Sequence, residues 1–577
     1  MFTHARCIIH HLFIMQTYQK PFSNLMLIVV GFLCAVSIAH PQNERNGTKL
    51  VVIITIDNFR NDYISKFEKS FSDSGFLWLK RTGTYFPNAF YDDAVTVTGK
   101  GHATITTGCY GGKSGIISNS WYSRDKLKSV NCVEDSTVAF VQSTGIAQEG
   151  QRSPINLRVM TIGDELKNKS PNSKVFGVSI KDRGAILPAG RNADGAYWFD
   201  DRNGVFATST YYRKNYPQWL QEFNKENSTA QYFNTQWTKL FPEEKYAGCD
   251  TDNAAYEEDP YHLTKAFPHP INGGVDAPDK MYYRALMHTP NGTDVLIDFA
   301  QQLIIGEQLG SRDVTDMLCL SISTMDFIAH AYGPNSHEIF DATARLDRSL
   351  ASFFRFLETT IGLSKCLLVV TADHGSAAMP EFLAKSGADA GRISPKSFIG
   401  DIEENLNTKF GKLANDKSWI EADHFPFLYI RRSGLTEKKI TLEDFEATFR
   451  PTVLQAKGIA ALFSRQEIES SKNNTPYFSA VKKSYHSNRA GDYFIIVKPN
   501  YIYTDSGEGT SHGSPHDYDA HVPLFIRSHV IPRGVVPARV GIADVAPTLA
   551  KSLQIPMSGE MDGKILPIKI SQSRKTK

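Results

Sequence analysis

Several stretches of the chain are apolar at almost every position, rather than at every second or every third to fourth position. The first of them, Leu50 to Ile56, reads LVVIITI and ends at Asp57. A continuous apolar run of this kind is typical of a parallel strand that is buried on both faces of a sheet. Similar runs are Val175 to Ile180, Met317 to Ser323, Cys366 to Thr371, Phe425 to Ile430, Tyr493 to Val497 and Val522 to Ile526. The pattern predicts a large, mostly parallel sheet.

Amphipathic helices are predicted between several of these strands. The clearest lies from Ile339 to Leu357, where Leu346, Leu350, Phe353 and Phe354 recur at helical spacing. Strands that alternate with helices favour an α/β fold, with helices on both faces of the central sheet. Such sheets bind ligands beyond the carboxyl ends of their strands, so we expect functional residues there.

Two stretches depart from this alternation and are predicted to be inserted cap segments. Residues 200–289 are rich in Tyr, Trp, Asn and Pro and have little periodicity, which is typical of a segment over the sheet. A second insertion is predicted at 379–489. The α/β domain as a whole is predicted at 49–567, and the basic segment 571–577 is predicted to be a flexible tail.

The N-terminal segment 1–39 has the features of a signal peptide. Lys20 precedes an apolar run from Leu25 to Ile38, and the small residues up to Ala39 suit a cleavage site. The run is short for a membrane span and polar residues follow it, so we expect no stable membrane span after cleavage. An uncleaved anchor is the alternative. The prediction is a periplasmic or secreted protein.

The charges are almost balanced. In 577 residues, 63 Lys and Arg stand against 61 Asp and Glu, and no basic run suggests a groove for nucleic acid. We therefore expect a small-molecule substrate and no nucleic-acid partner.

Removal of the leader would leave an odd number of cysteines, which cannot all pair. Those that remain are Cys109, Cys132, Cys249, Cys319 and Cys366. Cys109 and Cys132 are the pair that we expect to form a disulfide in an oxidising compartment. Cys319 and Cys366 lie in strand-like runs and are expected to be buried thiols.

A candidate nucleophile lies in the stretch from Val95 to Thr104, which reads VTVTGKGHAT. β-branched residues stop at Thr98, and glycines lead into a segment that can be helical, so the Thr98 hydroxyl would lie at a helix N-terminus. The free N–H groups and the dipole at that end favour an anion. A hydroxyl held there can act as a nucleophile if its proton is removed. The alternative is that Thr98 only caps the helix.

Residue types that bind metals stand at four of the predicted strand ends. They are Asp57, Asp326, His330, Asp373, His374 and His512. Asp326 and His330 lie four residues apart, so one helical turn puts them on the same face. Three carboxylates and three imidazoles suit two zinc ions. Taken singly, each has a structural alternative as a helix cap, a core histidine or a solvated loop residue, but repeated placement after buried strands would be costly without partners.

Taken together, the motifs resemble those of the alkaline phosphatase superfamily, in its type I phosphodiesterase and nucleotide pyrophosphatase branch. The motifs are Asp57, Thr98-Gly-Lys-Gly-His102, Gly115-Ile-Ile-Ser-Asn119-Ser-Trp121-Tyr122, Ser179-Ile-Lys181-Asp-Arg183, Asp326-Phe-Ile-Ala-His330, Thr371-Ala-Asp373-His374-Gly, His512-Gly and Asp544-Val-Ala-Pro547-Thr548-Leu549. The resemblance runs from about Lys49 to Pro567. Within the branch it is greatest to the phosphate-irrepressible alkaline phosphatases, which are monoesterases.

The resemblance implies two zinc ions and a covalent intermediate. Asp326, His330 and His512 would hold one ion, and the other would be held by Asp57, Asp373, His374 and the Thr98 oxygen. Thr98 would attack phosphorus and form a phosphothreonine.

The resemblance also implies how the substrate is bound. Asn119 would donate to a phosphoryl oxygen, and Lys181 and Arg183 would form the cationic pair that marks the monoesterases of this branch. A monoester dianion carries one more charged oxygen than a diester, so added positive charge favours it. The expected function is therefore that of a zinc-dependent alkaline phosphatase acting on small phosphate esters.

Two residues depart from the pattern of the family, at positions that touch no proposed zinc ligand. Lys100 stands where relatives commonly carry a small residue or proline, and we expect its side chain to point to solvent. Ser123 replaces an aspartate that often follows Trp-Tyr. His102 and the pair Asp92-Asp93 are expected to be structural.

Three other functions remain as alternatives. A phosphodiesterase or nucleotide pyrophosphatase could use the same zinc site. A sulfatase or phosphomutase of the superfamily is disfavoured, because those enzymes normally use a formylglycine or a serine where this chain has Thr98. An inactive binding protein on the same fold is disfavoured by the intact set of ligands.

Overall fold

The structure is a computed structural model of the chain. It describes residues 47–142, 145–147, 150–226, 228–470 and 474–571. The predicted leader at 1–39 and all of the predicted tail except Ser571 lie outside these residues, and both stay predictions. In the described part of the chain, no helix is both long and apolar enough to cross a membrane.

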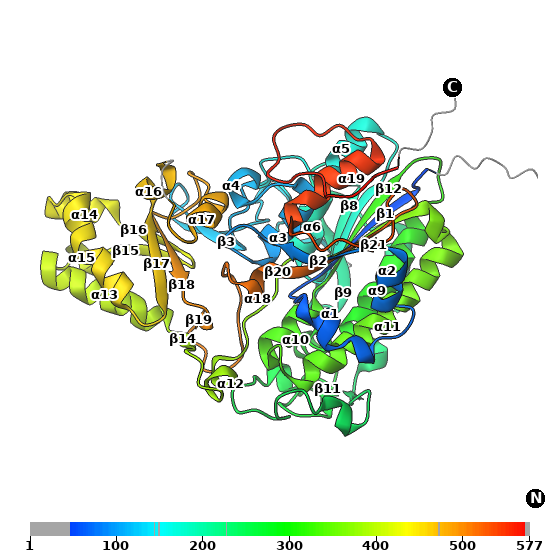
Figure 1. Cartoon of the computed structure of the whole chain (residues 1–577), viewed down its shortest axis with the longest axis horizontal. Coiled ribbons are helices and arrows are strands. Elements are labelled where there is room, and N and C mark those ends of the chain that lie inside the picture. Colours follow the sequence, from blue (N-terminus) through cyan, green and yellow to red (C-terminus); the bar gives the residue numbers. More distant parts are fainter. Residues whose placement is uncertain (1–46, 143–144, 148–149, 227, 471–473, 572–577) are drawn as a thin grey trace, which may run out of the picture. The chain divides into compact units, whose positions relative to one another are not determined.

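A 12-stranded sheet forms the centre of the α/β domain (Figure 1). Its strands are β1 (Leu50–Ile56), β2 (Thr84–Phe90), β5 (Phe140–Gln142), β6 (Gly145–Ala147), β7 (Val175–Ser179), β8 (Gly195–Asp200), β9 (Val205–Ser209), β12 (Asp316–Ile322), β13 (Cys366–Ala372), β20 (His521–Arg527), β21 (Gly534–Val535) and β22 (Val540–Gly541). The order is β21-β2-β20-β13-β1-β12-β7-β8-β9-β5-β6, and β22 also pairs with β2.

The middle of this sheet is parallel, from β13 through β1, β12 and β7 to β8. The strand β20 runs antiparallel to β13, and β9 runs antiparallel to β8. In the parallel part, Ile56 of β1 is opposite both Ile322 of β12 and Ala372 of β13. The three strands therefore end level with one another, and the residues that follow them meet at one edge of the sheet.

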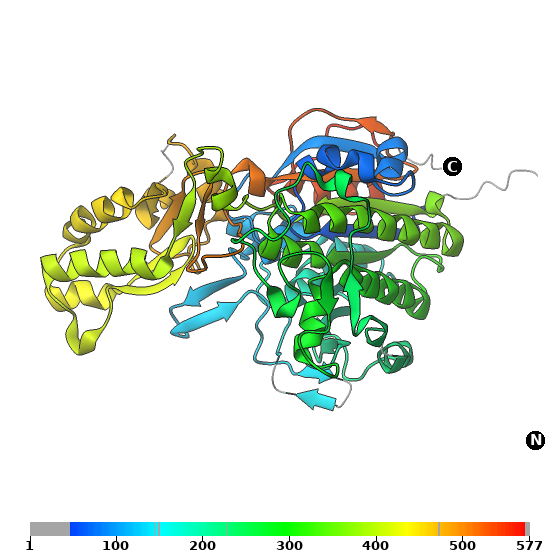
Figure 2. The same ribbon diagram turned by 90° about the horizontal axis from the view of Figure 1, so that it is seen from below.

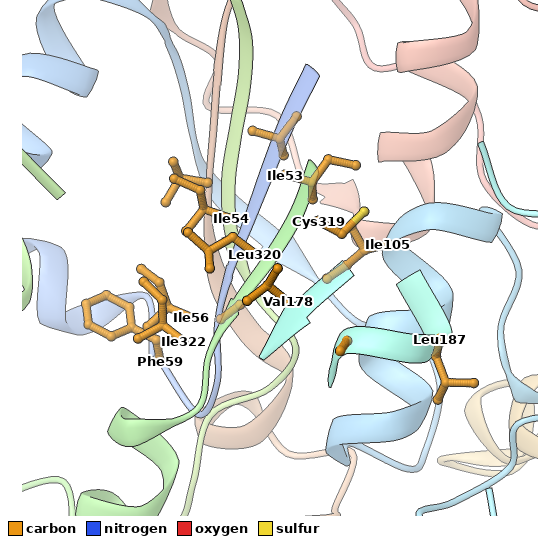
Figure 3. Close-up of a cluster of buried hydrophobic side chains, with 14 of the residues drawn as sticks. Ile53, Ile54, Ile56, Phe59, Ile105, Val178, Leu187, Cys319, Leu320 and Ile322 are labelled. Carbon is orange, nitrogen blue, oxygen red and sulfur yellow. The ribbon is translucent and has the colours of Figure 1, made fainter. Parts of the chain in front are cut away.

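Helices cover both faces of the sheet, as Figure 1 shows. One face carries α3 (Thr98–Thr107), α5 (Ile162–Lys169), α6 (Asp182–Ala189) and α19 (Val545–Leu553), and the other carries α2 (Phe76–Thr82), α9 (Pro290–Glu307) and α11 (His337–Thr360). Figure 3 shows Cys319 beside Ile105 of α3, whereas Ile54 and Ile322 point to the opposite side of the strands. The predicted α/β fold is confirmed, and the helix predicted at 339–357 lies within α11.

A second, four-stranded sheet contains β15 (Ile420–His424), β16 (Phe427–Ile430), β18 (Tyr493–Val497) and β17 (Ile459–Ser464), in this order. All of its neighbouring strands are antiparallel. The apolar runs predicted at 425–430 and 493–497 therefore do form strands, but the prediction that they join a mostly parallel sheet is wrong for them.

Burial on both faces explains why these two runs look like parallel strands. Leu428 and Ile495 enter a core with α13 (Pro395–Phe410) and α15 (Leu442–Gln455), two helices that lie side by side in Figure 2. Phe427 and Phe494, one residue along in each case, pack into the core of the large sheet instead. A sheet that is buried on both faces needs apolar side chains at every position, whatever the direction of its strands.

Residues 200–289 form several short elements with buried side chains. They include β9, α7 (Gln218–Glu226), α8 (Lys280–Met287) and the antiparallel pair β10 (Thr235–Trp237) and β11 (His269–Ile271). Leu220 of α7 and Trp237 of β10 are almost fully buried. The boundaries of the two insertions stay predictions.

The disulfide predicted between Cys109 and Cys132 is absent, and both residues are buried free thiols. Cys109 follows the C-terminal end of α3, whereas the Cys132 sulfur lies beside Gly99 in the first turn of that helix. A helix of ten residues is about 15 Å long, whereas the Cα atoms of a disulfide are about 4.4–6.8 Å apart. Cys319 and Cys366 are buried thiols, as predicted.

Candidate metal centre and nucleophile

The six predicted metal ligands converge at the carboxyl ends of the parallel strands. Asp57 follows β1, and Asp373 and His374 follow β13, the neighbouring strand that ends level with β1. Asp326 and His330 lie on α10 (Thr324–Tyr332), the helix that begins directly after β12. His512 comes from a loop before β20, and its ring stacks on that of His374 with 3.7 Å between the centroids.

The ligand atoms form two groups of three that share one aspartate. In the first group the atoms of Asp326, His330 and His512 all lie within 4.8 Å of one another. In the second group the same holds for Asp57, Asp326 and His374. Asp373 adjoins the second group, because its Oδ2 lies 3.5 Å from His374 Nε2.

The three histidines are held so that each offers the same nitrogen to a ligand. The Nδ1 atom of each ring pairs with a backbone carbonyl oxygen: that of Thr510 for His330 at 2.7 Å, that of Gly375 for His374 at 3.0 Å, and that of Thr96 for His512 at 2.8 Å. A carbonyl only accepts, so each Nδ1 carries the proton and donates it. Nε2 then keeps its lone pair for a metal, which is the usual arrangement for metal-binding histidines.

Several buried atoms of the site have no hydrogen-bond partner among the described residues. They are Asp57 Oδ1, Asp373 Oδ2, His374 Nε2 and Thr98 Oγ1. Buried polar atoms are normally satisfied, and leaving one unpaired costs about 1–3 kcal/mol. Three of these atoms lie together, because His374 Nε2 is 3.4 Å from Asp57 Oδ1 and 3.5 Å from Asp373 Oδ2. Two carboxylate oxygens and an imidazole nitrogen in this arrangement are ligand atoms that suit a divalent cation. The residues therefore fit bound metal.

The charges in the site are strongly coupled through Lys181. Its Nζ lies 2.7 Å from Asp57 Oδ2 and also donates to Asp326 Oδ2. Burial disfavours the ammonium, but the carboxylates of Asp326 and Asp57 outweigh it and raise the pKa of Lys181. The predicted partner of Lys181 is a phosphoryl oxygen, whereas here the side chain joins the two ligand groups.

Burial and the nearby Asp373 carboxylate raise the pKa of Asp57 well above its usual value. For Asp326, burial acts in the same direction, but Lys181 and His330 outweigh it and hold the pKa well below the usual range. Burial, together with the neighbouring His374 ring, lowers the pKa of His512. The imidazole is thus kept neutral, which is the form that binds a metal.

Thr98 is the first residue of α3, and its hydroxyl is buried at the N-terminal end of that helix. Val97 is the N-cap residue and has extended backbone angles, so the alternative that Thr98 itself caps the helix is not observed. The next backbone N–H, that of Gly99, donates to Asn119 Oδ1 at 2.7 Å. This contact holds the Asn119 side chain at the first turn of α3, next to the threonine.

Lys100 does not point to solvent, and this prediction is wrong. All residues of α3 are buried, and the Lys100 ammonium pairs with Asp93 next to the rings of Tyr91 and Tyr110. The helix packs against α6 and α19, and all of its residues are buried. Asp93 has the structural role that was predicted for it.

Arg183 lies in the first turn of α6, which begins directly after Lys181. Its Nε is buried without a hydrogen-bond partner among the described residues, and its closest carboxylate is that of Asp182 at 3.8 Å. The N-terminal end of α6 adds positive potential at the same place. Arg183 is therefore a cation that the described residues leave largely uncompensated.

Two buried residues of the site were not predicted as functional. Asn58 follows Asp57 and hydrogen-bonds to two of the aspartates, and His102 contacts the Thr98 carbonyl at 2.8 Å and Ser321 Oγ at 2.7 Å. Adjacency to Asp57 was the only signal for Asn58 in the sequence, and His102 lay inside the recognised motif.

Comparison with known proteins places the chain in a family. A family model described as type I phosphodiesterase / nucleotide pyrophosphatase matches residues 51–519. The chain is 34% identical to alkaline phosphatase PafA of Elizabethkingia meningoseptica over 93% of this chain and 97% of that one. It is 34% identical to a Myroides odoratus protein named calcium-transporting ATPase, over 92% and 96% of the two chains. It is 33% identical to alkaline phosphatase PhoV of Synechococcus elongatus, over 90% and 92%.

A solved crystal structure of wild-type PafA superposes with a TM-score of 0.85, covering 91% of this chain and 99% of that chain at 34% identity. The residues matched by the family model, 51–519, include all six candidate metal ligands. The chain belongs to the type I phosphodiesterase / nucleotide pyrophosphatase family of the alkaline phosphatase superfamily.

Proposed function

We propose that the protein is a metal-dependent alkaline phosphatase that hydrolyses phosphate monoesters through Thr98. The observation that carries the proposal is the Thr98 hydroxyl at the N-terminus of α3, which has no hydrogen-bond partner among the described residues. The ring of His102 joins this residue to the candidate metal ligands, since its Nδ1 lies 2.8 Å from the Thr98 carbonyl oxygen and 3.2 Å from Asp373 Oδ2. The relatives named alkaline phosphatase, which align over nearly the full chain, support it.

Two zinc ions are the proposed cofactors. Asp326, His330 and His512 would hold one, and the other would be held by Asp57, Asp373, His374 and the Thr98 oxygen. Bound zinc supplies Lewis-acid charge, which lowers the pKa of a hydroxyl and stabilises negative charge on a leaving oxygen. Two observations support this set. Several of its atoms have no hydrogen-bond partner among the described residues, and each of the three histidines binds a backbone carbonyl through Nδ1, which leaves Nε2 for a metal.

Turnover would proceed by two displacements at phosphorus. In the first, the Thr98 oxygen bonds to phosphorus, the bond from phosphorus to the alcohol oxygen breaks, and the alcohol leaves with one proton. In the second, a water oxygen bonds to phosphorus, the bond to Thr98 breaks, and the threonine hydroxyl regains its proton. The N-terminal end of α3 would stabilise the negative phosphoryl group in both steps.

The monoester preference would come from Lys181, Arg183 and Asn119. The Gly99 N–H fixes the oxygen of the Asn119 amide, and the amide nitrogen would donate to a phosphoryl oxygen. Arg183 is partly exposed and its guanidinium lies no closer than 3.8 Å to the Asp182 carboxylate, so it can pair with an anionic phosphoryl oxygen. A diester has one such oxygen fewer and would gain less.

A phosphodiesterase or nucleotide pyrophosphatase is the second candidate. A cavity of about 290 Å³ beside Lys181 is lined by Phe199, Tyr261, His288 and Phe327, together with other residues. The Lys181 ammonium lies 4.9 Å from the centre of the Phe327 ring, so the cavity adjoins the proposed phosphate site. Its aromatic walls could hold the second substituent of a diester.

We further propose that the protein is exported and that its leader is cleaved. The apolar run in segment 1–39, with small residues before His40, supports this. N-terminal sequencing of protein recovered from outside the cytoplasm would test it, with an intact N-terminus as the contrary result.

The central test compares substrates and metals on purified protein. We expect faster release of phosphate from an aryl phosphate than hydrolysis of its methyl diester, loss of both after chelation, and recovery with zinc. Metal analysis should find two zinc ions per chain. ATP should be assayed in parallel, because its terminal phosphoryl group is also a dianion. Faster turnover of the diester, or full activity without metal, would contradict the proposal.

A further inference from the structure

Within the described part of the chain, Asn58 is the one residue whose uncharged donors bind both Asp326, which the two ligand groups share, and Asp373, which adjoins the second group. It follows Asp57, is fully buried, and has a φ of 58°. Its backbone N–H donates to Asp373 Oδ1 at 3.1 Å. Its side-chain amide nitrogen donates to Asp326 Oδ1 at 2.9 Å.

We propose that Asn58 is a positioning residue, which fixes the Asp326 carboxylate relative to Asp57 and Asp373 and so sets the separation of the two metal sites. The inference rests on the metal-dependent function proposed above. It assigns to Asn58 a contact with ligand side chains and none with substrate.

The backbone of Asn58 explains half of this role. A positive φ is uncommon for residues other than glycine, and asparagine is among the few that adopt it at modest cost. In this conformation the chain turns sharply after β1, and the N–H of Asn58 faces the aspartate that follows β13. Asp57 and Asp373 are thereby tied together across neighbouring strands, without a charged group between them.

The side chain explains the other half. Asp326 Oδ1, which accepts from the Asn58 amide, also lies 3.4 Å from His330 Nε2 and 3.6 Å from His512 Nε2. The amide thus orients the one carboxylate oxygen that faces both histidines of the first group. Hydrogen bonds from neighbouring residues commonly orient ligands in this way, and their loss typically lowers metal affinity about 10- to 100-fold.

A purely structural turn residue would not need this arrangement. Glycine would satisfy the positive φ equally well and would bury no polar side chain. Asn58 instead buries an amide whose oxygen has no partner among the described residues, which destabilises the folded protein. The neutral amide also adds no fourth carboxylate to a cluster that already contains three.

The test uses Asn58→Gly in the zinc-loaded enzyme. Glycine keeps the positive φ and the N–H to Asp373 but removes the donor to Asp326. Zinc release is followed as a function of chelator concentration, and zinc positions are located by anomalous scattering from crystals grown at limiting zinc. We expect one of the two zinc ions to be bound about 10-fold more weakly, and the ion beside His330 and His512 to lose occupancy first.

Asn234→Gly is the matched control, because Asn234 has a φ of 60° and lies outside the site. It should leave both release steps unchanged, and melting of the metal-free protein should be the same for both variants. If Asn58→Gly releases both ions as the wild type does, or weakens both equally, the inference is overturned. A wild-type enzyme without two bound zinc ions would refute the proposed function itself, and the role of Asn58 with it.

Discussion

At the carboxyl ends of β1 and β13, Asp57, Asp373 and His374 are fully buried, and each keeps an atom without a hydrogen-bond partner among the described residues. In the second sheet, Asp492 precedes β18 and is also buried. Its oxygens accept from the guanidinium groups of Arg124 and Arg432, and from the backbone N–H of Ile430 at 2.9 Å.

The two regions bury charged side chains for different reasons. The partners of Asp492 lie within the chain, so its charge stabilises the fold around the second sheet. Asp57 and Asp373, at the ends of β1 and β13, accept hydrogen bonds from Lys181 and from the Asn58 N–H respectively, but each keeps one oxygen without a hydrogen-bond partner among the described residues. A region that leaves buried metal-binding atoms without hydrogen-bond partners is adapted to bind a ligand, and this lowers the stability of the protein without that ligand. Variants of the two regions should therefore affect activity and stability separately.

The largest effect is expected for Thr98→Ala, which removes the proposed nucleophile. Turnover of an aryl phosphate should fall by a factor on the order of 10³ or more. Unfolding by denaturant should hardly change, because the hydroxyl has no hydrogen-bond partner to lose among the described residues. Thr98→Ser should keep much of the activity, and intact mass of acid-quenched wild type should show one phosphate adduct. An active Ala variant would rule out the covalent route.

The next largest effect concerns the cationic pair. Lys181→Ala and Arg183→Ala should each lower kcat/KM for a monoester by roughly 30- to 1000-fold, equivalent to about 2–4 kcal/mol, and should affect its methyl diester much less. Lys181→Ala should also destabilise the metal-free protein, because Asp57 and Asp326 lose their shared cation. Lys126→Ala, at an exposed position, is the control and should change neither activity. Equal losses on both substrates would mean that the pair supports the fold rather than the monoester.

The second sheet should respond in the opposite way. Asp492→Asn removes the charge that two arginines share, so the free energy of unfolding should fall by about 1–3 kcal/mol. Activity at saturating zinc should stay within about twofold of the wild type. Asp125→Asn, at an exposed position in a turn, serves as the control and should change neither quantity. A loss of turnover with unchanged stability would mean that the two regions are not separate.

The smallest effect is a pH dependence of stability from Glu257. This carboxyl is almost fully buried, and burial, with the nearby Glu338 carboxylate, raises its pKa to about 9. The folded state therefore holds a proton that the unfolded chain releases above about pH 4.5, so the contribution of Glu257 to stability declines as pH rises between these values. The decline is at most about 1.4 kcal/mol per pH unit.

Glu257→Gln should flatten this part of the curve of unfolding free energy against pH, measured at constant ionic strength. The substitution leaves the candidate metal centre untouched, so turnover at pH 8 should not change by more than about twofold. A curve as steep as that of the wild type would assign the decline to other acids.

The strands around the site could be predicted because their cause is local. A run such as LVVIITI is apolar at every position because both faces of β1 are covered, and the ligand types that follow such runs are visible in the sequence. The motif around Thr98 likewise indicated a hydroxyl at a helix N-terminus, and α3 begins there. The predictions were wrong where the outcome depended on how far apart two residues lie in the folded structure. Cys109 and Cys132 are close in sequence relative to the whole chain but lie at opposite ends of α3.

The sequence by itself determined the α/β fold and the ligand types that follow its strands, because these depend on periodicity and on motifs along the chain. Only the tertiary structure decided that Asp326 joins both ligand groups, that Lys181 lies between two aspartates, and that Lys100 is buried against Asp93. It also decided that the runs at 427–430 and 493–497 build a separate sheet. These features depend on which strands end level and which helices pack together, and such contacts join residues that lie hundreds of positions apart in the chain.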